Sequence, residues 1–147
     1  MKPDGPLKHF VIAFLIAAAC YAVFYPTIEH RRVRKGPWEV AFTNSSEGAP
    51  MVVINQPKLA ITNVQLSFPD HPALPTPAQT NFAFKQPREV PYTVPLGECV
   101  FMDTTFLPGT VTFKLAGHEV ELLPRVLIVD HQEYPWVSGS TLTLHRH

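Results

Sequence analysis

Residues 112–121 read TFKLAGHEVE, and their pattern predicts a β-hairpin. If residues 116–117 form a two-residue loop, Phe113 lies opposite Val120 on one face, and a lysine faces a glutamate on the other. Cross-strand pairs of this kind each contribute about 0.2–1 kcal/mol. A shift of one residue would place Phe113 opposite a glutamate, so the register is well specified. Because alanine is unfavourable in the usual two-residue turns, the alternative is a loop one residue longer with a bulge at Gly117.

Apolar and polar residues also alternate elsewhere in the chain. Such period-two runs occupy residues 38–42, 64–68, 82–84 and 142–144, as expected for strands with one buried face. Two other runs, 51–54 and 126–129, are apolar on both faces and predict central or doubly covered strands. Sixteen prolines among 147 residues exclude a helical bundle. We therefore predict a mainly β chain whose residues 37–147 form an antiparallel β-sandwich of about seven to nine strands.

A proline-rich segment interrupts this pattern. Residues 69–80 read PDHPALPTPAQT and contain four prolines. Proline lacks the backbone N–H that a regular sheet requires, so we expect a surface connection or an edge segment here.

The N-terminal region has a different character. Residues 10–25 read FVIAFLIAAACYAVFY, without a charged side chain. As a helix this run would span about 24 Å, close to the hydrocarbon thickness of a bilayer. We expect a single transmembrane anchor at residues 10–28, after a short tail at 1–9 and before a basic juxtamembrane linker at 29–36.

Three alternatives to an uncleaved anchor remain open. The three alanines at 17–19 could precede the cleavage site of a secretory signal. The same alanines followed by Cys20 also loosely resemble a bacterial lipoprotein signal, in which Cys20 would carry the lipid. The third alternative is a helix buried in the globular domain. The residues after Cys20 remain apolar, which argues against both cleavage interpretations.

A net charge of zero conceals a strong asymmetry along the chain. Residues 1–35 carry six basic and two acidic side chains, a net charge of +4. Residues 36–147 carry six basic and ten acidic side chains, a net charge of −4. This distribution predicts contact with a lipid bilayer through residues 10–28 and argues against a nucleic-acid partner.

The same charges leave the orientation open. Two basic residues precede the apolar run and four follow it closely, so the positive-inside rule favours a cytosolic β domain. A short lysine-bearing start before an apolar run is also typical of a signal-anchor, which would export the domain. We expect a single-pass protein of the cell membrane with an extracytoplasmic β domain.

The sequence lacks the usual catalytic motifs. It contains no glycine-flanked nucleophilic serine, no phosphate-binding glycine loop and no H-E-x-x-H. Glu119 and Glu121 share a strand face opposite Lys114, and we interpret them as a solvated surface rather than a catalytic pair. We therefore expect no enzymatic activity, no catalytic residues and no cofactor.

Metal binding is a further possibility. His145 and His147 would point the same way on a strand, and Cys99 and Met102 would add soft sulfur ligands suited to copper. We nevertheless interpret these four residues as structural and assign no metal site to the chain. His118 and His131, which lie beside acidic residues, are interpreted as structural too. The two cysteines also exclude a four-cysteine zinc site and a disulfide-stapled miniprotein.

Two more segments carry functional hypotheses. Residues 130–136 mix charged and aromatic side chains around a proline, and such residues are enriched in binding sites. The simpler interpretation is that Trp136 covers one end of the core. Asn44 begins a glycosylation sequon, which matters only for an exported eukaryotic protein.

Together these observations predict a membrane-anchored β-sandwich with a non-catalytic binding or structural role. We expect an accessory subunit or assembly factor of a membrane complex, which contacts a membrane-protein partner through sandwich edges or through residues 130–136. The alternative is a copper- or zinc-handling module at the membrane surface that uses His145 and His147.

Overall fold

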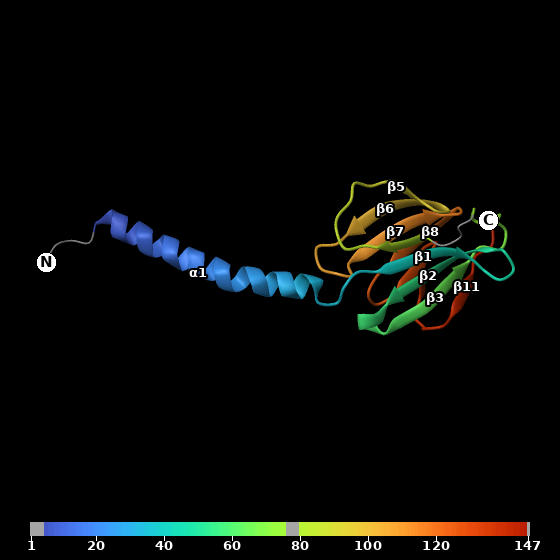
Figure 1. The fold of residues 1–147 in the computed structure, drawn as a ribbon, viewed down its shortest axis with the longest axis horizontal. Coiled ribbons are helices and arrows are strands. Elements are labelled where there is room, and N and C mark those ends of the chain that lie inside the picture. The colour runs from blue at the N-terminus through green and yellow to red at the C-terminus, as the bar shows by residue number, and fades with distance from the viewer. Residues whose placement is uncertain (1–4, 76–79, 147) are drawn as a thin grey trace.

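The computed structural model describes residues 5–75 and 80–146 and consists of one long helix followed by two packed β-sheets (Figure 1). The helix projects from one end of the sandwich, and the chain between them is short. This arrangement confirms the predicted mainly β fold with one N-terminal apolar helix. Part of the proline-rich segment, residues 76–79, lies outside the described residues, as do residues 1–4 and 147.

Helix α1 runs from Pro6 to Val33 and buries none of its residues against the sandwich. It is long and apolar enough to span a membrane. The helix is longer than the anchor predicted at 10–28, because residues 6–9 of the predicted tail and residues 29–33 of the predicted linker are also helical. Basic side chains occupy its last turn, where the helix dipole favours positive charge. The helix then ends just before Gly36, which has a φ of 74°.

The eleven strands of the described residues form two sheets. The first, sheet A, has the order β11-β3-β2-β1-β4, and the second, sheet B, has the order β10-β9-β8-β7-β6-β5. In chain order the strands are β1 (Glu39–Asn44), β2 (Pro50–Gln56), β3 (Ile61–Ser67), β4 (Thr80–Ala83), β5 (Tyr92–Val94), β6 (Gly97–Asp103), β7 (Thr110–Leu115), β8 (His118–Leu122), β9 (Leu127–Val129), β10 (Gln132–Tyr134) and β11 (Thr141–Thr143). A 3-10 turn, η1 (Pro57–Leu59), joins β2 to β3.

The strand count exceeds the seven to nine that we predicted. The strands that no predicted run covers include β5 and β10, which contain three residues each. Prolines and turns leave room for only brief pairing, which the sequence pattern does not resolve. One pair departs from the antiparallel arrangement, because β11 runs parallel to β3.

The two runs predicted to be apolar on both faces are covered on only one. The run at 51–54 belongs to β2, the middle strand of sheet A, so its central position is confirmed. Val52 and Ile54 are buried, but Met51 and Val53 are only half-buried on the other face. In β9, Ile128 is likewise half-buried between two buried neighbours. Full coverage of these strands was therefore wrong, because nothing in the described chain packs outside either sheet.

The hairpin of β7 and β8 has the predicted register, with Phe113 opposite Val120. Its loop contains only two residues, Ala116 and Gly117, with φ angles of 51° and 86°. The alternative with a bulge at Gly117 was therefore wrong. Bulges occur instead in β3, opposite Asn55 of β2, and in β6.

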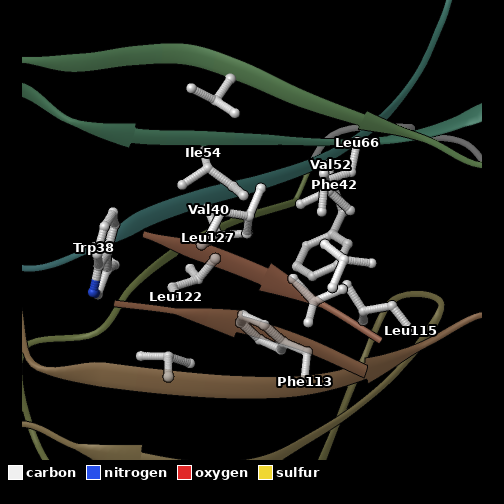
Figure 2. Close-up of a cluster of buried hydrophobic side chains, with 14 of the residues drawn as sticks. Trp38, Val40, Phe42, Val52, Ile54, Leu66, Phe113, Leu115, Leu122 and Leu127 are labelled. Atoms are coloured by element: carbon white, nitrogen blue, oxygen red, sulfur yellow. The ribbon is translucent and has the colours of Figure 1, made fainter. Parts of the chain in front are cut away.

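The core lies between the sheets, with inward side chains from both (Figure 2). Val40 and Phe42 of β1 point toward Phe113 and Leu122 of sheet B, and the rings of Phe42 and Phe113 meet edge-on at 6.4 Å. Trp38 is fully buried at the end nearest α1 and donates from Nε1 to the Gly109 carbonyl at 3.0 Å. The apolar alternation in the sequence therefore corresponds to one continuous core.

The helix end contacts the β6–β7 loop directly. The Leu107 amide donates to the Arg32 carbonyl at 2.7 Å, and Arg32 Nη1 donates to the Thr104 carbonyl at 3.4 Å. Arg32 also forms an ion pair with Glu29 at 3.0 Å, one turn earlier in the helix. The last turn of α1 therefore lies against the end of the sandwich.

Candidate functional site

The outer faces of the two sheets differ in charge. Strand registers and burial place the outward side chains of sheet A in one set, which we call the amide face. Its members are Glu39, Ala41, Thr43, Met51, Val53, Asn55, Gln65, Ser67, Asn81, Ala83, Thr141 and Thr143. Glu39 alone among them is charged. Protein interfaces are depleted in charged residues at their centres, so this face has the composition of a contact surface.

Sheet B presents a charged outer face. Its outward charged side chains are Glu98, Asp103, Lys114, Glu119, Glu121 and Glu133. Lys114 lies opposite both Glu98 and Glu119 in the strand register, so it has an acidic neighbour on each of the two adjacent strands. The structure thus places Glu119 and Glu121 on the acidic outer surface of a sheet, as their spacing predicted.

A shallow hollow of about 360 Å³ lies on the amide face near its free edge. Ala41 of β1 and Ala83 of β4 form its floor, where small side chains leave the backbone accessible. Asn55 and Asn81 line it with amide groups, and Glu39 lines it with a carboxylate. Such a hollow could accept a protruding side chain or a short extended segment of a partner.

The edge strands also differ between the sheets. In sheet B, prolines at 91 and 95 flank β5, while β10 contains Glu133 and precedes Pro135. Charges and prolines of this kind prevent edge-to-edge pairing. Strands β4 and β11, at the two edges of sheet A, contain neither a charge nor a proline. The uncharged edge strand β4 therefore borders the hollow.

The residues considered for metal binding lie in separate places. Cys99 is buried in β6, and its Sγ lies 3.6 Å from the Phe101 carbonyl, while burial raises the pKa of its thiol. Met102 is half-buried further along β6. His145 lies beyond β11, with Nδ1 at 3.2 Å from Asp70 Oδ2. His147 lies outside the described residues. Among described residues, no group of three histidine, cysteine, aspartate or glutamate side chains converges on a metal position.

The most elaborate polar cluster surrounds His118, which the sequence analysis did not single out as functional. His118 is buried at the end of the sandwich far from α1. Its Nδ1 lies 2.6 Å from Asp130 Oδ2 and its Nε2 lies 3.0 Å from the His145 carbonyl. Asp130 also accepts the Glu119 amide at 3.0 Å. The sequence did contain one indication of this cluster: the predicted hairpin register places His118 at an inward-facing position, where a polar side chain needs hydrogen-bond partners.

This cluster connects three segments of the chain. The β7–β8 hairpin supplies His118, the β9–β10 turn supplies Asp130, and the C-terminal segment supplies the His145 carbonyl. His131, the other residue of the β9–β10 turn, is exposed and has a φ of 66°. The hydrogen bonds of His118 thus join three segments of the chain, which gives this residue a structural explanation.

Residues 130–136 do not form one surface. Asp130 and His131 make a turn at the end far from α1, whereas Trp136 lies at the end nearest α1. The Trp136 ring packs on Trp38 at 5.1 Å, and its Nε1 donates to the Leu123 carbonyl at 2.8 Å. The simpler interpretation, that Trp136 covers one end of the core, matches this packing.

The predicted glycosylation position is engaged within the chain. Asn44 Nδ2 donates to the Leu74 carbonyl at 3.0 Å, and Asn44 Oδ1 accepts the Leu74 amide at 2.8 Å. This pair of hydrogen bonds holds the start of the proline-rich segment against β1. A glycan on Asn44 would disrupt both bonds.

Comparison with known proteins gives no match: no family model fits the chain, and no curated protein sequence or solved structure resembles it.

Proposed function

We propose that this protein is a membrane-anchored, non-catalytic accessory subunit or assembly factor, and that its β domain binds a membrane-protein partner through the amide face. The single observation that carries the proposal is the difference in charge between the two outer faces. The amide face is nearly free of charge, while the opposite face is acidic. Such a difference is unnecessary for folding, since both faces lie outside the core.

The shape of the amide face supports the same proposal. The hollow at Ala41 and Ala83 offers a recess, and among the described strands β4 is an edge of sheet A beside it. Binding by addition of a strand to a free edge is a common mode of peptide recognition. A partner that entered the hollow and paired with β4 would combine both features.

Anchoring in the membrane allows even a small interface to bind the partner. Helix α1 is long and apolar enough to span a bilayer, and it exposes its apolar side chains along its whole length. A domain tethered to the membrane of its partner has a high effective concentration there.

We propose a single-pass position in the cell membrane with the β domain outside the cytoplasm. Protease accessibility in sealed vesicles tests the sidedness, and the mass of the intact chain tests cleavage or lipidation at Cys20.

Site-specific photocrosslinking in native membranes tests the partner-binding surface. A photoreactive amino acid at Asn81, an exposed position of edge strand β4, is expected to give a discrete adduct with one membrane protein. The matched control is Glu133, an exposed position of edge strand β10 in the other sheet. Equal crosslinking from both positions, or none from Asn81, would contradict the proposal.

Substitution of the hollow provides a second test. Ala41→Arg should fill the recess with a charged side chain and abolish the Asn81 adduct. Ile128→Arg introduces the same charge at a half-buried, outward position of sheet B and should leave the adduct intact. Thermal unfolding of both variants establishes that the loss reflects binding rather than folding.

A further inference from the structure

The end of the sandwich nearest α1 gathers loops from both sheets. We call it the proximal end. Strand directions and hydrogen bonds place the following segments there: 34–38, 56–61, 84–87, 104–109, 123–126 and 135–140. In Figure 1 this is the end that adjoins the helix. Any bilayer that contained α1 would lie directly beneath it.

Three basic side chains, from loops that are distant in the sequence, lie at the proximal end. Lys58 lies between β2 and β3, Lys85 follows β4, and Arg125 lies between β8 and β9. All three are exposed. Lys85 and Arg32 line the same surface depression, which places the β4 loop directly beside the helix end. The acidic groups at or near this end include Glu29, which pairs with Arg32, together with Glu39, Asp103 and Glu89, which follows Arg88 just beyond segment 84–87.

The basic residues of the linker extend this charge. Arg31, Arg34 and Lys35 are exposed at the end of α1 and just beyond it. At the opposite end of the described domain the balance is reversed. That end carries the basic residues Lys114 and Arg146 and the acidic residues Glu47, Asp70, Glu98, Glu119 and Asp130. A domain with a net charge of −4 thus turns a basic end toward its own helix.

Large apolar side chains are exposed among these cations. Phe106 is 57% exposed in the β6–β7 loop, next to the Leu107 amide that binds the Arg32 carbonyl. Val137 is 53% exposed at the same end, in the loop before β11. Phe101 is 50% exposed and lines a depression together with Arg32. Aromatic side chains beside basic ones are favourable in the interfacial region of a bilayer.

The length of α1 places this end at headgroup depth. The predicted anchor ends at Ile28, and Arg32 is four residues further on, a rise of about 6 Å. The polar headgroup region on each side of the hydrocarbon core is about 5–7 Å thick. The Arg32 carbonyl, and with it the Phe106 loop, would therefore lie at the outer boundary of the headgroups.

We propose that the proximal end of the sandwich is a second membrane contact, which binds the surface of a bilayer that contains anionic lipids. Lys58, Lys85 and Arg125 contact lipid phosphates, and Phe106 inserts between headgroups. The domain then stands on the membrane in one orientation, with the amide face held perpendicular to the bilayer. This inference rests on the proposed membrane anchoring, and it holds for either side of the membrane.

Hydrogen exchange of the full chain in lipid nanodiscs tests the contact. One set of discs contains phosphatidylcholine alone, and the other contains phosphatidylcholine with one third phosphatidylglycerol. We expect exchange at residues 58–60, 104–107 and 125–126 to slow at least about tenfold with the anionic lipid, since each basic side chain near such a surface contributes favourably to binding. High salt should reverse the slowing, because it screens exposed charges.

Charge-reversal variants identify the residues responsible. The triple variant K58E/K85E/R125E should lose the lipid-dependent slowing, and Phe106→Ser should lose part of it. The matched control K114E/R146E reverses two basic residues at the opposite end and should retain it. Slow exchange in the β2 and β7 amides of every variant verifies that the sandwich is folded.

The outcomes separate this inference from the anchor. If the α1 amides are protected in both lipids while the proximal loops exchange equally fast, the second membrane contact is wrong and the anchor stands. If the α1 amides themselves exchange rapidly in both lipids, the anchor and the contact are both wrong. Equal slowing in K58E/K85E/R125E and in the unmodified chain would likewise overturn the contact.

Discussion

His118 shows how a single buried polar residue organises one end of the sandwich. Both groups that its ring nitrogens meet, the Asp130 carboxylate and the His145 carbonyl, accept hydrogen bonds. The ring therefore bridges the β9–β10 turn and the C-terminal segment. Because a buried polar group without a partner is costly, this arrangement favours one position of the C-terminal segment.

Substitutions of Asp130 test that role. Asp130→Ala removes the partners of His118 Nδ1 and of the Glu119 amide, and it places alanine at a φ of 50°. We expect a loss of about 2 kcal/mol or more in the free energy of unfolding. Asp130→Asn keeps an acceptor for the Glu119 amide and tolerates that backbone angle, although it places an amide donor opposite His118 Nδ1, so its loss should be smaller than that of Asp130→Ala. Urea denaturation compares the two variants, and equal losses would contradict the role of the hydrogen bonds.

Asp70 makes the C-terminal contact sensitive to acid. The Arg146 amide donates to Asp70 Oδ2 at 2.8 Å and, with a smaller contribution from His145, lowers the pKa of this carboxyl below its ordinary value of 3.8. A lowered pKa means that the contact stabilises the fold above that value and stops doing so as the pH falls through the folded-state pKa.

The stability of Asp70→Asn should therefore depend less on pH. We expect this variant to be slightly less stable than the unmodified chain near neutral pH, and the difference to shrink as the pH falls below the ordinary carboxyl pKa of 3.8. Urea unfolding at several pH values measures the difference. A constant difference across this range would show that the charge of Asp70 contributes nothing.

At the scale of elements, the β7–β8 hairpin combines a well-specified register with an unfavourable turn residue. The paired faces of the strands determine the register, since a one-residue shift would expose the core positions. Ala116 nevertheless adopts a φ of 51°, where alanine is strained. The pairing of the two strands and their neighbours therefore outweighs the local preference of the turn.

Relief of this strain should stabilise the protein. Ala116→Asn introduces the residue preferred before glycine in such turns, and we expect a gain of about 0.5–1 kcal/mol in the free energy of unfolding. Thermal unfolding monitored by circular dichroism measures the change. A destabilised variant would show instead that the contact of the Ala116 methyl with the core matters more than its backbone angle.

The apolar composition of helix α1 predicts that the helix exists but does not predict where it ends. Its apolar run was apparent in the sequence, but the helix continues through Pro26 and into the basic residues that follow. Thr27 Oγ1 donates to the Val23 carbonyl at 3.0 Å, within the turn that Pro26 interrupts. The helix thus tolerates Pro26 and ends at Val33, three residues before Gly36-Pro37, a pair that disfavours any continuation of the helix.

At the scale of the whole molecule, anchoring should depend on the apolar surface of α1. The double variant Leu15→Arg/Ala19→Arg places two charges on one face of the helix, at a cost of about 2.5–3.5 kcal/mol each near the bilayer centre. We expect it to shift from the membrane pellet to the carbonate-soluble fraction. Glu47→Arg, in an exposed turn of the sandwich, adds positive charge elsewhere and should remain in the pellet.

Local patterns account for much of the fold. Alternating residues predicted most of the longer strands, and the pairing of Phe113 with Val120 predicted a register. These features depend on neighbouring residues, because side-chain direction has a period of two in a strand. Strands β5 and β10, the parallel pairing of β11 and the bulges were not predictable, since they depend on contacts between distant segments.

The sequence by itself determined the apolar helix, the β character of the remaining chain and its unequal charge along the length, because each follows from composition or short-range periodicity. The tertiary structure decided which side chains share a surface. Strand order brings Lys58, Lys85 and Arg125 to the end that bears α1, and it gathers uncharged residues from five strands on the amide face. No spacing along the chain encodes these groupings, because hydrogen bonds between distant strands create them.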